Sequence, residues 1–216
     1  MMQKRHKTVA VVLALLATPM AHAQSMDVLL NCSTCHVASP DPEATATAGR
    51  EIYPVLNGQP ARYIERQLMA YRQGLRQHRQ MEQTALALGE GAGAMARLYA
   101  GAPHPDLVFR DPPEDHATAL DLVEDGDWSR GLAPCASCHS LDPEDDRARL
   151  SPRLHGQPEA YLADQLRAYA DGTRSSDPMG RMRGYSERLT PSEISALARY
   201  FASWTPDSKN SEGGSE

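Results

Sequence analysis

A chain of 216 residues, 41% of them hydrophobic, is long enough to form two domains of ordinary size. Its 28 acidic and 22 basic side chains give a net charge of −6, which argues against nucleic-acid binding. No segment stays apolar over the roughly 20 residues that a membrane span needs.

The N-terminal residues have the pattern of an export signal. Basic side chains precede a short apolar run at 9–16, and Ala21-His22-Ala23 offers a small-residue cleavage site. We therefore expect residues 1–23 to be a signal peptide that is cleaved after Ala23. Because Lys4, Arg5 and Lys7 leave with it, the net charge would fall from −6 to −9. We expect the mature protein in the periplasm, soluble or peripherally associated with the membrane.

Two copies of the pattern C-x-x-C-H contain every cysteine of the chain. They consist of Cys32, Cys35 and His36, and of Cys135, Cys138 and His139. This pattern is the attachment signature of c-type haem, in which two thiols add to the vinyl groups and the histidine becomes the proximal iron ligand. The sequence therefore predicts two covalently bound haem c groups. A four-cysteine zinc site would join pairs about a hundred residues apart, and a redox dithiol lacks its βαβ setting.

The residues that follow each motif are duplicated. Residues 54–76 and 152–174 share the same prolines, glycines, tyrosines and Gly-Gln-Pro step at a constant offset of 98 residues. The repeat predicts a first unit at 24–100 and a second unit at 117–205. Residues 101–116, which are rich in proline and acidic side chains, are expected to be a linker. Residues 206–216 are expected to be a disordered tail.

The regular elements that the sequence predicts are helices. Apolar residues recur at helical spacing, and Thr190 and Pro191 suit the first positions of a helix. The predicted helices cover residues 60–74, 90–100, 117–128, 158–172 and 190–201. No segment alternates as a strand does, so the predicted fold is all-α. Only about eight mature residues precede Cys32, so the first unit has a shorter leading helix than the second.

A thioether on the other face of each haem would close the iron site and raise its reduction potential. Met81 and Met182 each lie seven residues before a leucine that the repeat preserves, which makes them matching candidates. Met179 competes with Met182 because it lies, like Met81, seven residues after the glycine that ends the preceding helix. His78 is the alternative in the first unit and would give bis-histidine ligation. We expect the remaining histidines, His104, His116 and His155, to be loop residues.

Together these residues resemble the di-haem cytochrome c4 family, whose members are tandems of two class I cytochrome c domains. The resemblance runs from Cys32 to Trp204 and rests on both haem motifs, the P-x-L-x-G-Q segment and the helix Y-x3-Q-L-x2-Y-x2-G-x-R. It favours Met182, which is followed seven residues later by Leu-Thr. It also implies that the carbonyls of Pro54 and Pro152 accept a hydrogen bond from the proximal imidazoles.

The resemblance implies electron transfer between redox proteins, such as a respiratory oxidase or a dehydrogenase, rather than catalysis on a substrate. The shortened first unit and the acidic linker depart from the family pattern. A shortened first domain also occurs in cytochrome subunits of larger dehydrogenases, such as flavocytochrome sulfide dehydrogenases, and this is the alternative function. A haem enzyme is the third hypothesis, but it needs an open iron or a reactive ligand, and no cysteine is spare.

Overall fold

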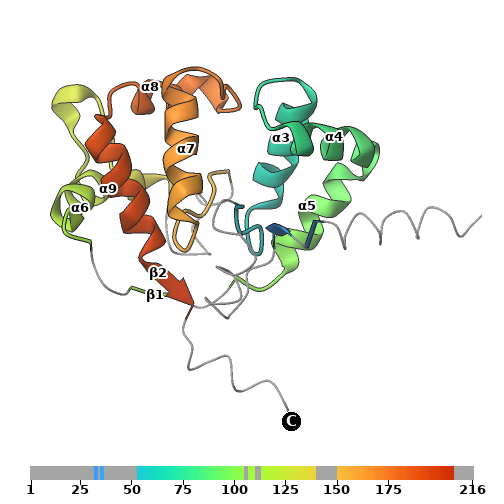
Figure 1. The fold of residues 1–216 in the computed structure, drawn as a ribbon, viewed down its shortest axis with the longest axis horizontal. Coiled ribbons are helices and arrows are strands. Elements are labelled where there is room, and N and C mark those ends of the chain that lie inside the picture. The colour runs from blue at the N-terminus through green and yellow to red at the C-terminus, as the bar shows by residue number, and fades with distance from the viewer. Residues whose placement is uncertain are drawn as a thin grey trace, which may run out of the picture.

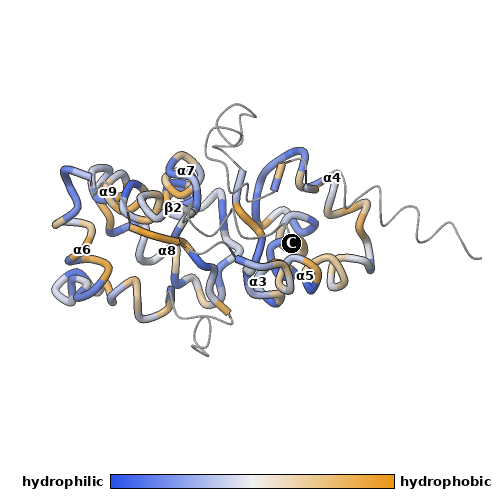
Figure 2. Tube along the Cα trace, turned by 90° about the horizontal axis from the view of Figure 1, so that it is seen from below, coloured by the Kyte–Doolittle hydropathy of each residue, from blue (hydrophilic) through white to orange (hydrophobic). Residues whose placement is uncertain are grey.

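The computed structural model describes residues 32–33, 35–36, 53–104, 107–109, 113–139 and 150–206. Its helices form two groups that lie side by side, one from each half of the chain (Figure 1). The view from below shows that apolar stretches are distributed over both groups (Figure 2). The predicted signal peptide and residues 207–216 lie outside the described residues. Within the described part of the chain, no helix has both the length and the apolar character to span a bilayer.

The first unit is built around helix α3, Ala61–Arg72, which packs against α4 and α5. Helix α4 covers Arg79–Leu88, a short 3-10 turn η2 covers Gly89–Gly91, and α5 covers Ala92–Gly101. The apolar stripe predicted for α3 is buried among these helices, through side chains such as Ile64 and Leu68. No helix was predicted over residues 79–88, where α4 forms.

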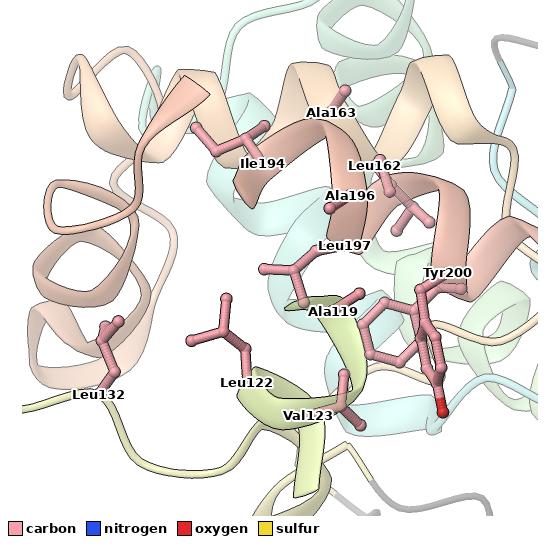
Figure 3. Close-up of a cluster of buried hydrophobic side chains, with 12 residues drawn as sticks. Ala119, Leu122, Val123, Leu132, Leu162, Ala163, Ile194, Ala196, Leu197 and Tyr200 are labelled. Carbon is pink, nitrogen blue, oxygen red and sulfur yellow. The ribbon is translucent and has the colours of Figure 1, made fainter. Parts of the chain in front are cut away.

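The described residues of the second unit form several helices and 3-10 turns. They are α6 at His116–Glu124, η3 at Trp128–Arg130, η4 at Cys135–Ser137, α7 at Glu159–Ala170, η6 at Pro178–Gly180, α8 at Arg181–Ser186 and α9 at Pro191–Ala202. Helices α6, α7 and α9 enclose a core of aliphatic and aromatic side chains, among them Leu122, Leu162 and Leu197 (Figure 3). The predicted start of α9 is correct. Thr190 and Glu193 form a capping box, in which each side chain accepts a hydrogen bond from the other residue's backbone N–H.

A two-stranded sheet occurs where none was predicted. Strand β1, Leu107–Phe109, pairs antiparallel with β2, Trp204–Pro206, so that Val108 faces Thr205. β1 lies within the segment that was expected to be a linker and connects it to the end of the second unit. Three residues are too few to show the alternation that identifies a strand in a sequence. The helix-rich fold predicted from the sequence is confirmed.

We expect Ile194→Ala in α9 to lower the free energy of unfolding by about 2–5 kcal/mol, because it opens a cavity in the core of the second unit. The Ile194 side chain is 5% exposed. Leu86→Ala is the matched control, because Leu86 is 56% exposed and its truncation should change stability by about 0.5 kcal/mol at most. Urea unfolding measures both. Equal losses would contradict this description of the core.

Candidate haem sites

Both C-x-x-C-H histidines are buried and held by a proline carbonyl. His36 Nδ1 lies 2.9 Å from the carbonyl oxygen of Pro54, and His139 Nδ1 lies 2.7 Å from that of Pro152. Since a carbonyl can only accept, Nδ1 carries the proton and donates it, which leaves Nε2 free as a metal ligand. Burial lowers the pKa of both imidazoles, with the proline carbonyls acting in the opposite direction. The neutral ring that an iron ligand requires is therefore favoured.

The four cysteines form no disulfide and are partly exposed. Burial raises the pKa of Cys135 to about 11, and burial together with the nearby Cys35 raises that of Cys32. The 3-10 turn η4 begins at Cys135, so the second C-x-x-C-H motif forms a tight turn. The described residues contain no group of three or more His, Cys, Asp or Glu side chains placed to bind a metal ion.

A single cavity of about 820 Å³ joins the two motifs. Its wall includes the cysteines and histidine of each motif, leucines and tyrosines from both units, and the methionines considered as ligands. An apolar wall with a few polar groups is typical of a site for a large planar cofactor. The structure thus brings two sequence motifs, about a hundred residues apart, to one continuous space.

The candidate axial ligands occupy matching places at the start of a helix. Met81 lies in the first turn of α4 and Met182 in the first turn of α8, both partly buried along the cavity wall. Met179 is 93% exposed and has a left-handed backbone with φ of 60°. The exposed His78 caps α4, where its Nδ1 accepts a hydrogen bond from the Met81 N–H at 3.4 Å. These positions favour Met81 and Met182 over Met179 and His78.

Two buried arginines, which the sequence analysis assigned to no site, lie between the units. Arg76 and Arg174 are equivalent positions of the repeat and are only 6% and 4% exposed. Both guanidinium groups donate to the side-chain oxygens of Gln67 and Gln165, over 2.7–3.1 Å. Each one also donates to a tyrosine hydroxyl of the other unit, Arg76 to Tyr161 at 3.0 Å and Arg174 to Tyr63 at 3.2 Å. We call these six residues the arginine cluster.

The charge of the arginine cluster is not neutralised by the described part of the protein. Neither guanidinium has a carboxylate partner there, although each lies over an aromatic ring, Arg76 over Tyr71 at 4.8 Å and Arg174 over Tyr169 at 4.4 Å. Burying an unpaired charge is costly, so anionic groups are required nearby. Haem carries propionate carboxylates, and both arginines line the cavity. The residues present therefore fit haem in two ways. The cysteines and histidines suit its attachment and its iron, and the arginines suit the charge of its carboxylates. Only their recurrence at the offset of 98 could have marked these arginines in the sequence.

Two of the other histidines are more than loop residues. His116 begins α6 and stacks on Tyr200, with ring centroids 5.5 Å apart. His155 is 5% exposed and meets Phe201 and Trp204 edge to face. Burial lowers the pKa of His155 to about 3, so this ring is neutral. The prediction of simple loop residues is therefore wrong for His116, and incomplete for His155, because packing partners that are distant in sequence decided both environments.

Comparison with known proteins agrees with this site. Residues 132–205 match the Cytochrome c family. The thiosulfate dehydrogenase electron acceptor of Stutzerimonas stutzeri (strain A1501) is 34% identical over 173 residues, which cover 79% of this chain and 77% of that protein. The cytochrome c4 structure from Acidithiobacillus ferrooxidans has a TM-score of 0.62 and 25% identity, covering 81% of this chain and 98% of the other.

A thiosulfate dehydrogenase (TsdBA) from Marichromatium purpuratum has a similar structure, with a TM-score of 0.65 and 31% identity. The match covers 84% of this chain but only 37% of that longer one. Fold and site together define a class I cytochrome c protein that binds haem c covalently and transfers electrons. More narrowly, the chain belongs to the di-haem cytochrome c4 family.

We expect Arg76→Gln to lower the free energy of unfolding by roughly 2 kcal/mol or more, because hydrogen bonds to a charged group contribute about 1.5–3 kcal/mol each. Arg167→Gln is the control, since Arg167 makes an exposed ion pair with Asp164, which should contribute at most about 1 kcal/mol. Urea unfolding of the haem-loaded protein measures both. If Arg76→Gln instead raises the stability, the hydrogen bonds and nearby anionic groups do not compensate the cost of burying the two positive charges.

Proposed function

We propose that this chain is an exported electron carrier with two haem c groups, one in each unit. The observation that carries the proposal is the pair of C-x-x-C-H turns, each with a buried histidine held by a proline carbonyl, that open into one cavity. Haem bound at Cys32 and Cys35, and at Cys135 and Cys138, supplies an iron that alternates between the ferric and ferrous states. Export agrees with the signal-like N-terminus, with residues 24–216 as the mature protein in the periplasm.

In this proposal the side chains hold each iron six-coordinate. His36 and His139 donate Nδ1–H to Pro54 and Pro152, which fixes each ring and directs Nε2 to the metal. Met81 and Met182, each in the first turn of a helix along the cavity wall, would supply a thioether as the second iron ligand. A filled sixth position keeps small molecules from the metal, which suits electron transfer better than catalysis.

The arginine cluster would hold the haem carboxylates between the two units. Because each arginine is bound by residues of both units, the same contacts that receive the carboxylates also hold the units together. The two irons would then be fixed with respect to each other, and an electron could pass between them without movement of the units.

We expect Met81→Leu and Met182→Leu each to remove about half of the near-infrared band of ferric iron bound to methionine, because each would take the sulfur from one of two haems. Leucine fills a similar volume, so packing is little disturbed. Met179→Leu is the matched control and should leave the band unchanged, since this side chain is 93% exposed. The absorption spectrum of the ferric protein measures all three. Loss of the band in Met179→Leu instead of Met182→Leu would refute the assignment in the second unit.

A thiosulfate-oxidising dehydrogenase is the electron donor that we infer. One relative at 34% identity is named as the electron acceptor of thiosulfate dehydrogenase, and a thiosulfate dehydrogenase structure contains a region similar to 84% of this chain. This favours the dehydrogenase-associated alternative over a general shuttle. It points to thiosulfate rather than sulfide as the compound that the partner oxidises.

We expect a thiosulfate dehydrogenase, supplied with thiosulfate, to reduce this protein in stopped-flow absorption measurements. Thiosulfate without the dehydrogenase should leave it ferric, because a six-coordinate iron offers no site for the substrate. Reduction by thiosulfate alone would support the haem-enzyme hypothesis. If the dehydrogenase does not reduce the protein, the proposed electron donor is wrong, but the proposal that the protein is an electron carrier still stands.

Purification from the native host tests whether the protein is part of a complex. A dehydrogenase that copurifies in a stable, stoichiometric ratio would identify it as a complex subunit.

A further inference from the structure

Two buried glutamines cross between the units and bind the backbone on the other side. Gln157 of the second unit donates from Nε2 to the Val55 carbonyl and accepts from the Val55 N–H on Oε1, both at 2.9 Å. Gln59 of the first unit makes the same pair of hydrogen bonds, also at 2.9 Å, with the backbone of Arg153. Gln59 is 2% exposed and Gln157 is 3% exposed. Each side-chain amide therefore forms hydrogen bonds with both the N–H and the carbonyl of one residue in the opposite unit, as a neighbouring β-strand would.

The residues that they bind are next to the prolines that hold the histidines. The N–H of Val55 and the carbonyl of Pro54 belong to one peptide group, and so do the N–H of Arg153 and the carbonyl of Pro152. A peptide group is planar and rigid, so fixing its N–H also fixes the direction of its carbonyl. The chain of contacts runs from Gln157 through one peptide plane to His36, and from Gln59 through another to His139.

We propose that each glutamine is a positioning residue for the iron ligand of the opposite unit, Gln157 for His36 and Gln59 for His139. The inference rests on the proposed function, in which both histidines bind iron. It adds a crossed arrangement, in which each unit influences the reduction potential of the haem in the other unit. Within the described part of the chain, the two side chains bond only to the other unit, so their own unit's histidine is not what they orient.

Loss of one of these glutamines should shift the reduction potential of the haem in a defined direction. A peptide whose N–H is hydrogen-bonded has a more strongly accepting carbonyl, because linked hydrogen bonds polarise one another. A stronger acceptor at Nδ1 makes the imidazole a more basic ligand. A more basic ligand stabilises ferric over ferrous iron and lowers the reduction potential. Removing the amide of Gln157 should therefore raise the potential of the haem attached at Cys32 and Cys35.

Gln157→Leu and Gln59→Leu in the full haem-loaded chain test the crossed arrangement. Redox titration followed by proton NMR resolves the two haems, and contacts to residues around Cys32 or Cys135 assign each set of signals. We expect Gln157→Leu to raise the potential and shift the signals of the first haem alone, and Gln59→Leu those of the second alone. Gln73→Leu, at the exposed end of α3, is the matched control and should change neither.

Two further variants separate positioning from general packing. Gln157→Glu keeps an acceptor oxygen for the Val55 N–H, and a carboxylate accepts more strongly than an amide. It should therefore bring the potential of the first haem down from its value in Gln157→Leu, to the wild-type value or below it. If Gln157→Leu does not fold, Gln157→Met replaces it, because the unbranched methionine adapts to buried gaps. A shift in the haem of the glutamine's own unit, equal shifts in both haems, or no shift would overturn the proposal.

The haem content and ligation of the wild-type protein are measured first. A haem count below two per chain, or ferric spectra without histidine–methionine ligation, would defeat the proposed function itself. Two haems with that ligation but without the crossed pattern would defeat only the roles of Gln59 and Gln157.

Discussion

The buried charge of Arg76 and Arg174 is the constraint on which the rest of the structure depends. Two guanidinium groups without a carboxylate partner among the described residues can be buried only if neutral oxygens accept their hydrogen bonds and anionic groups approach from the cavity. Gln67 and Gln165 supply the oxygens, each accepting from an arginine of its own unit and from one of the other. The contact between the units and the affinity of the cavity for an anionic cofactor thus have the same origin.

The repeat makes this contact reciprocal. Equivalent residues face each other across the boundary, so the bonds that Arg76 and Gln59 make to the second unit have counterparts in those that Arg174 and Gln157 make to the first. An ancestral single unit that paired with a second copy of itself would make the same contacts, because a two-fold interface brings equivalent patches together. Duplication in one chain allows the two sides to differ, as in the capping of α4 by His78 and the short turn before α8.

The two crossing glutamines give the contact a chemical consequence. They hold the peptide groups that orient His36 and His139, so the boundary between the units includes part of the environment of each proposed iron ligand. A carrier built in this way cannot separate its units without loosening both ligands. A partner that docks on one unit can in turn influence the other unit through rigid peptide planes rather than through movement.

The sequence by itself determined the haem motifs, the repeat and the helices that flank them, because each is a local pattern of residue types at fixed spacing. It also narrowed the axial ligands to Met81, Met179, Met182 and His78. It did not lead to a prediction of α4, or of the β1–β2 pair, whose strands are only three residues long. Nor could it give a role to Arg76, Gln59 or Gln157, since a buried polar residue and an exposed one look alike in a sequence. Only the tertiary structure decided those roles, because they depend on hydrogen bonds between residues about a hundred positions apart that meet only when the two units pack together.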